Sequence, residues 1–201
     1  MSVVLTKEYP APEINRREIY RYMQAKGSDR ALDALIDRGL ELSLDKLCYK
    51  VCFAEFPVVE HDGKLDLGFA TAESQDLKKC LDGCDKILLF AATVGASLDR
   101  LILRYSRLEP SMALCLGAIG SERAEALSDA FCADMASQYN AQGFSLRPRF
   151  SAGYGDLPLS MQRDIIAILN APQKIGVSLN ESLLMSPTKS VTAIIGIKGT
   201  K

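Results

Sequence analysis

Apolar residues near the start of the chain recur at the three- and four-residue spacing of amphipathic helices. A first helix is predicted to begin after Asn15, whose side chain suits an N-cap, and to end at Gly27. Ser28 or Asp29 is positioned to cap a second helix. The apolar side chains of that helix share one face: Leu32, Leu35, Ile36, Leu40 and Leu44.

The pattern then changes to one typical of strands. Residues 48–59 are rich in β-forming types, and an Asp-Gly pair separates them from a shorter run over 65–70, which predicts a hairpin. The run over 86–94 is apolar at nearly every position and predicts a strand buried on both faces. A last apolar run, 191–197, predicts another strand.

Helical and extended segments complete the pattern. The helices are expected over 74–83, 96–108, 110–140 and 159–170, and an extended segment over 144–150. Gly117 and Gly120 are candidate positions for a kink in the longest helix. The elements do not alternate as regular βαβ units, so we expect an α+β fold with an antiparallel or mixed sheet and packed helices.

Length and charge narrow the class of protein. The 201 residues carry no internal repeat or long linker, which favours a single domain over 1–201. The 24 basic and 25 acidic residues leave no positive excess for binding nucleic acid by bulk charge. No apolar run reaches the roughly 18 residues of a membrane helix, and the first residues do not resemble a signal peptide. We therefore expect a soluble, cytoplasmic protein with no nucleic-acid or membrane partner.

The cysteines allow two interpretations. Two pairs have three intervening residues, which is not the two-residue spacing of zinc knuckles or thioredoxin-like sites. On a strand, Cys48 and Cys52 share a face and are expected to be small core residues. A metal or redox role for the cysteines remains the alternative. The six are Cys48, Cys52, Cys80, Cys84, Cys115 and Cys132.

Other motifs for catalysis are incomplete. The Gly153-Tyr-Gly155 sequence lacks the third glycine of a dinucleotide fingerprint, because Pro158 stands at that position. The one histidine, His61, is expected in an exposed turn, which argues against a catalytic triad. Glu122 and Glu125 are three residues apart on a helix and are expected to form a solvated face.

Two segments in the last third of the chain are more specific. The first, 149–154, has the pattern Arg-x-x-x-Gly-Tyr, and the second, 181–191, reads ESLLMSPTKSV. In this order they resemble the reactivation (activation) domain of cobalamin-dependent methionine synthase. The segments 92–95 and 124–127 also fit that family, and the first 85 residues look like its stand-alone bacterial members. The resemblance implies N-terminal helices and a hairpin over 1–85 and an activation-domain-like core over 86–201.

The family's properties give a functional expectation. Its domain binds S-adenosylmethionine beside a bent antiparallel sheet and docks on a cobalamin module, where reductive methylation of cob(II)alamin restores methylcobalamin. The electron comes from a flavodoxin- or ferredoxin-like donor. This chain lacks the cobalamin motif around His61 and has no adjacent cysteine pair for the homocysteine module. The resemblance therefore implies an accessory methyltransferase subunit in methionine biosynthesis, acting on the cobalamin of a separate methionine synthase subunit.

The resemblance also implies a binding site for S-adenosylmethionine. Arg149 would meet the carboxylate of the ligand, and Glu125 would face its ammonium or sulfonium group. Ala152 and Gly153 would let the backbone approach the ligand, and Tyr154 would offer its ring edge or hydroxyl. The site residues are Glu125, Arg149, Ser151, Ala152, Gly153 and Tyr154. Three alternatives remain open. Arg149 and Tyr154 could serve only as a surface ion pair and a loop-packing residue, the protein could bind a corrinoid protein without S-adenosylmethionine, or the cysteines could carry its function.

Overall fold

A five-stranded antiparallel sheet forms the centre of the protein. The computed structural model describes residues 2–25, 27 and 29–199. The strand order is β1-β2-β6-β10-β7, and every neighbouring pair is antiparallel. The strands are β1 (Leu5–Glu8), β2 (Lys50–Pro57), β6 (Lys86–Thr93), β7 (Phe144–Leu146) and β10 (Ser190–Gly199). Elements from the first 85 residues and from the rest of the chain therefore pair within one sheet.

The central strand β6 is buried on both faces. Its side chains alternate between two hydrophobic clusters: Leu88 and Phe90 pack on one side of the sheet, and Ile87 and Leu89 pack on the other. Every residue from Ile87 to the end of the strand is buried. The sequence prediction of a doubly covered strand over 86–94 is confirmed.

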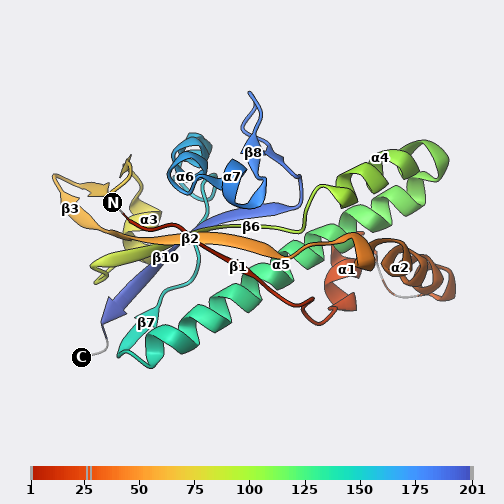
Figure 1. Ribbon diagram of the computed structural model, residues 1–201, viewed down its shortest axis with the longest axis horizontal. Helices are drawn as coiled ribbons and strands as arrows, with labels where there is room; N and C mark the ends of the chain where they lie inside the picture. The colour runs from red at the N-terminus through yellow and green to blue at the C-terminus, as the bar shows by residue number, and fades with distance from the viewer. Residues whose placement is uncertain (1, 26, 28, 200–201) are drawn as a thin grey trace.

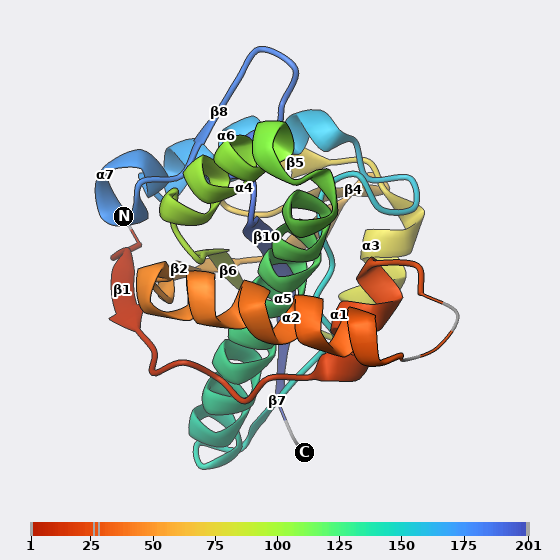
Figure 2. The same cartoon turned by 90° about the vertical axis from the view of Figure 1, so that its right-hand side faces the viewer.

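Helices cover the two faces of the sheet (Figure 1). Residues of α1, α2, α4 and α5 belong to one cluster, and residues of α3, α6 and α7 belong to the other. Figure 2 shows α2 lying across the long α5, with α1 next to it. The helices are α1 (Arg16–Tyr22), α2 (Arg30–Ser43), α3 (Gln75–Cys80), α4 (Ser97–Leu108), α5 (Pro110–Asn140), α6 (Gln162–Ile168) and α7 (Ala171–Ile175). Short 3-10 turns, η1 (Leu44–Lys46) and η2 (Leu159–Met161), precede β2 and α6.

The predicted hairpin turn is confirmed, but both of its strands differ from the prediction. Most of the run over 48–59 forms β2, which pairs with β1 and β6 instead of entering the hairpin. β3 (Val59–His61) pairs with β4 (Lys64–Asp66), and both turn residues, Asp62 and Gly63, have positive φ angles of 50° and 79°. β4 ends at Asp66 because Gly68, with φ of 73°, turns the chain into β5 (Thr71–Ala72). These three strands form a small second sheet.

Of the first two helices, one boundary differs from the sequence analysis and one cap agrees with it. Asn15 caps α1 as predicted, but the helix ends at Tyr22 rather than Gly27. The reason is that Gln24 takes a left-handed φ of 55°, which ends the helical path before the glycine is reached. Asp29 caps α2 by accepting a hydrogen bond from Leu32 N, and Ser28 lies outside the described residues.

The long helix α5 runs from Pro110 to Asn140 as one element, through both candidate kink positions. At Gly120, a Cβ atom would lie 2.3 Å from Leu98 Cδ2. This glycine therefore permits the close approach of α4 to α5. Several short elements were not predicted, namely β1, α7, β8 (Ser178–Leu179) and β9 (Met185–Ser186).

Glu122 does not lie on a solvated face, contrary to expectation. It is buried, and both its oxygens accept hydrogen bonds from the fully buried Arg123, at 2.6 and 2.5 Å. The same guanidinium donates to the carbonyls of Pro12 and Glu13, and Glu122 accepts from Asn15 N at 2.9 Å. The N-terminal segment crosses this part of α5 and excludes water from it.

Candidate functional site

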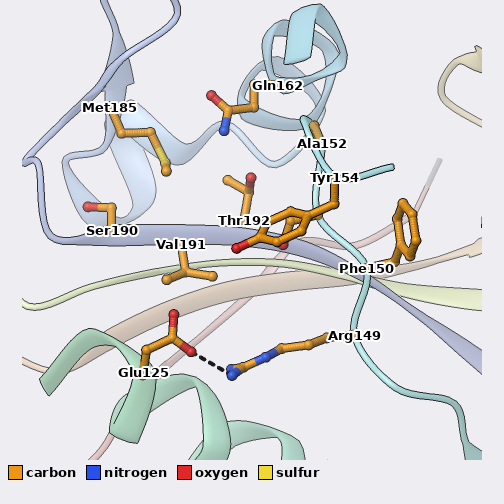
Figure 3. A pocket seen from close by; sticks show the side chains of 11 residues that line it. Glu125, Arg149, Phe150, Ala152, Tyr154, Gln162, Met185, Ser190, Val191 and Thr192 are labelled. Carbon is orange, nitrogen blue, oxygen red and sulfur yellow. Dashed lines mark hydrogen bonds and ion pairs between the residues drawn. The ribbon is translucent and has the colours of Figure 1, made fainter. Parts of the chain in front are cut away.

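A cavity of about 450 Å³ lies at the edge of the main sheet, near the start of β10 (Figure 3). Its volume is within the range of pockets that bind small organic ligands. It is lined by Glu125, Arg149, Phe150, Ser151, Ala152, Tyr154, Gln162, Met185, Ser190, Val191 and Thr192. Five separate parts of the chain converge here: α5, the loop after β7, α6, β9 and β10.

The loop after β7 is fixed to β10 by a short backbone contact. Phe150 N and O exchange two hydrogen bonds with Ile194 O and N, each 2.8 Å long. This bridge places Arg149 and Ser151 on either side of a fixed point, beside the open edge of β10. Arg147, the residue before Pro148, is not helical, as its sequence context predicts, and its N–H donates to Gly196 O at 2.8 Å.

Arg149 is the electrostatic centre of the cavity. Its Nη2 atom lies 2.6 Å from Glu125 Oε2 and 3.1 Å from Asp129 Oδ1. The two carboxylates are one helical turn apart on α5, so they present themselves to the same cation. The Nη1 atom of Arg149 is buried and has no hydrogen-bond partner among the described residues. One end of the guanidinium is thus satisfied, and the other is free to donate.

Two neutral polar groups lie on the opposite side of β10. Gln162 Oε1 and Thr192 Oγ1 are both buried and without a hydrogen-bond partner in the described part of the chain. Their residues are only 7% and 2% exposed, respectively. Buried polar atoms are almost always paired in folded proteins, so these two in one cavity require an explanation.

The glycine-rich loop is held in place by its own turns and by α3. Gly153 has φ of 89°, and its N–H donates to Leu157 O at 2.9 Å. Asp156 reaches across to the start of α3, where it accepts from the hydroxyl of Ser74 and from Gln75 N at 2.7 Å. The Ser74 hydrogen bond and the backbone N–H groups hold the pKa of Asp156 below its ordinary value.

The structure brings five of the six predicted site residues to this one cavity, namely Glu125, Arg149, Ser151, Ala152 and Tyr154. Gly153 is adjacent but does not line it, and a Cβ there would contact Leu159 Cδ1 at 3.1 Å. Glu125 faces Arg149 rather than open space. Sequence reasoning missed Asp129, Gln162 and Thr192. Of these, only Asp129 had a signal, its four-residue spacing from Glu125.

No cysteine or histidine lines this cavity, although Cys132 on α5 lies close enough to Arg149, Asp129 and Glu125 to feel their charges. Burial raises the pKa of Cys52, Cys115 and Cys132 to about 11. Cys52 is a core residue as expected, whereas Cys48 precedes β2 and is half-buried. The side chain of His61, at the end of β3 beside the turn, is 81% exposed, in agreement with the expected exposure. Within the described ranges, no three histidine, cysteine or acidic side chains are grouped to hold a metal, and no helix could cross a membrane.

The fold defines an α+β class in which a bent antiparallel sheet is packed between helices. No model of a known protein family matches the sequence, and no curated protein matches it. Among solved structures, the chain is similar to the MetH reactivation domain in a crystal structure with bound AdoHcy (S-adenosylhomocysteine). The TM-score is 0.75 at 14% identity, covering 96% of this chain and 78% of that one. The chain has the fold of the MetH reactivation domain, as the motif resemblance predicted.

Proposed function

We propose that the protein is a reactivation subunit that binds S-adenosylmethionine in the cavity beside Arg149. It would present the methyl group to the corrinoid of a separate, cobalamin-dependent methionine synthase subunit in the cytoplasm. Two findings support this proposal: the fold is shared with a domain that binds AdoHcy, and the cavity carries charges suited to an amino acid.

The observation that carries the proposal concerns the guanidinium of Arg149, whose Nη2 atom is paired and whose Nη1 atom is not. The unpaired Nη1 offers a buried donor to a carboxylate, while Glu125 and Asp129 beside Nη2 offer acceptors to an ammonium group. A ligand with only a carboxylate would bring a third negative charge to one guanidinium. A zwitterion adds no net charge, so the α-amino acid group of S-adenosylmethionine fits this arrangement.

The loop residues supply the rest of the contact surface. Ser151 and Ala152 line the cavity next to Arg149, and the turn at Gly153 fixes their backbone. Tyr154 is 69% exposed, and its side chain extends across the cavity towards Val191 (Figure 3). From there the ring can cover a bound ligand and contact its positively charged sulfonium through the π face.

In the proposed reaction, this chain has only to bind and orient the methyl donor. S-adenosylmethionine supplies an electrophilic methyl group, whose S–C bond breaks with the electron pair remaining on sulfur, so that AdoHcy is the product. The reduced corrinoid of the partner supplies the electron pair of the new bond, after one electron arrives from a flavodoxin- or ferredoxin-like donor. The residues of this chain bind and orient the methyl donor, and such positioning alone can lower a barrier by several kcal/mol.

Titration calorimetry with S-adenosylmethionine and AdoHcy tests the binding site directly. The folded protein should bind both at one equivalent, and Arg149→Ala should weaken binding by about 1.5–3 kcal/mol through loss of a charged hydrogen bond. Lys174→Ala, an exposed cation on α7, is the control and should leave the affinity unchanged. No binding by folded wild-type protein would overturn the proposal.

Affinity purification of the protein from its native cell tests the partner, with cobalt measured in the eluate. Cobalt together with null calorimetry would favour the alternative of a corrinoid-binding module that does not use S-adenosylmethionine. Stoichiometric zinc or iron in the purified protein would instead support the cysteine-based alternative.

A further inference from the structure

The cavity extends around the edge of β10. The part of it on the α6 side is lined by neutral side chains. Val191 packs towards the α5 side of the sheet, where Glu125 and Arg149 lie. Thr192 points to the opposite side, where Gln162 of α6 lies, because neighbouring side chains of a strand alternate (Figure 3). An elongated ligand that fills this cavity and binds Arg149 with its charged end therefore reaches Gln162 and Thr192 with its other end.

We infer that Gln162 and Thr192 recognise the adenine base of the ligand, with Gln162 determining the specificity for its 6-amino group. This inference rests on the proposed function, because it concerns the far end of the same ligand.

The first argument is the unpaired state of two buried atoms. Gln162 and Thr192 line the cavity, and their Oε1 and Oγ1 atoms are buried without a partner in the described ranges. The two residues are only 7% and 2% exposed. Leaving a buried polar atom unpaired is unfavourable, by about 1–3 kcal/mol. A ligand group that pairs with both atoms removes this penalty, whereas an apolar group would keep it.

The second argument is the match of donors and acceptors. A glutamine carboxamide presents one acceptor and one donor side by side, and adenine presents its 6-amino donor beside a ring-nitrogen acceptor. This is the pairing by which glutamine reads adenine in nucleic acids. The hydroxyl of Thr192 can both donate and accept, so it suits a further ring nitrogen.

The third argument is the shape of the surrounding walls. Met185 lies on one side of the Gln162–Thr192 pair and Tyr154 lies on the other (Figure 3). A thioether and an aromatic ring both make favourable contacts with a flat aromatic base. The subsite therefore combines polar recognition at its base with apolar or aromatic flanks.

Calorimetric affinities for two ligands test this inference. One ligand is AdoHcy, and the other is its analogue with purine as the base, in which hydrogen replaces the 6-amino group. The analogue leaves Gln162 Oε1 unpaired, so the wild-type protein should prefer AdoHcy by about 5- to 150-fold. Gln162→Leu should reduce this ratio of affinities to about one, mainly by weakening the binding of AdoHcy. Gln173→Leu, the same substitution at an exposed position of α7, should keep the wild-type ratio.

The outcomes separate the two proposals. Failure of the folded wild-type protein to bind AdoHcy overturns both the proposed function and the adenine subsite. Tight binding of AdoHcy with a wild-type ratio near one overturns the subsite alone, and this measurement requires no variant. An unchanged ratio in Gln162→Leu also overturns it. Thr192→Val preserves the shape of the side chain and should weaken both ligands similarly, because both retain the ring nitrogens.

Discussion

Arg149 and Glu125 form an ion pair of 2.6 Å at the centre of the cavity, between the loop after β7 and the long helix α5. Asp129 adds a second carboxylate at 3.1 Å. The guanidinium is thus held in position before any ligand arrives, which reduces the entropy lost on binding. The same pairing means that the carboxylate of a ligand must share this cation with two others. The affinity of the site should therefore depend on a positive group in the ligand as much as on its carboxylate.

Substitution of Glu125 tests this dependence, because it should change the affinities of two ligands in opposite directions. Glu125→Gln should weaken the binding of AdoHcy by about 1.5–3 kcal/mol, because a charged acceptor for its ammonium group is lost. It should strengthen binding of the AdoHcy analogue that lacks the α-amino group, because a repelling charge is removed. Calorimetry with both ligands measures the two changes. If Glu125→Gln affects both ligands in the same direction, the ammonium does not bind at this carboxylate. Asp164→Asn, on the exposed side of α6, is the control.

The buried pair of Glu122 and Arg123 should contribute to stability rather than to binding. Their side chains are 2% and 0% exposed, and the pair anchors the N-terminal segment through two further carbonyls. Glu122→Gln leaves the buried cation without its charge partner, so it should lower the unfolding free energy by about 3–5 kcal/mol. Urea denaturation measures this loss. Glu18→Gln removes the carboxylate of the exposed pair with Arg21 and should lower the unfolding free energy by less than about 1 kcal/mol. Equal losses in the two variants would contradict the prediction.

The sequence was most informative where one local pattern determines the structure. The apolar run of β6 can only be buried on both faces, and Asp62-Gly63 suits a tight hairpin turn. The motif from Arg149 to Tyr154 likewise forms one local loop beside β10. These features need little knowledge of distant parts of the chain.

The missed residues depend on contacts between distant segments. Gln162 resembles any polar residue in the first turn of a helix, and Thr192 resembles any residue of a buried strand. Their unpaired atoms become visible only when α6 is placed beside β10. Glu122 was misassigned for the same reason, since the segment that buries it is more than 100 residues away in sequence. Tertiary burial overrides the local preference of a glutamate for water.

The contact between Asp156 and the start of α3 should make stability depend on pH. Hydrogen bonds from Ser74 and from the backbone lower the pKa of Asp156 in the folded protein. A carboxyl with a depressed pKa stabilises the fold fully above its unfolded pKa, about 3.9, and loses this contribution as pH falls through its folded pKa. The difference in unfolding free energy between wild type and Asp156→Asn should therefore be constant near neutral pH and shrink in acid.

Urea denaturation over a series of pH values measures this difference. Glu181→Gln, at an exposed position in the β8–β9 connection, is the control and should show a smaller dependence on pH. A difference for Asp156→Asn that grows in acid would have the wrong sign for a carboxylate stabilised by hydrogen bonds.

Gly155 should be intolerant of a side chain, in contrast to Gly117. Gly155 has φ of 53°, and a Cβ there would lie 2.5 Å from Asp76 Oδ2. Asp76 can move its flexible side chain, so the left-handed backbone accounts for most of the effect, and Gly155→Ala should be destabilising by about 1–2 kcal/mol. Gly117 lies within α5, where a Cβ would meet nothing within 4 Å, so Gly117→Ala should be stabilising by about 0.5–1 kcal/mol. Thermal unfolding distinguishes the two signs. Because Gly155 lies between Tyr154 and Asp156, strain introduced by Gly155→Ala should also weaken the binding of AdoHcy, while Gly117→Ala should leave its affinity unchanged. Stabilisation by both substitutions would show that the turn does not need its left-handed conformation.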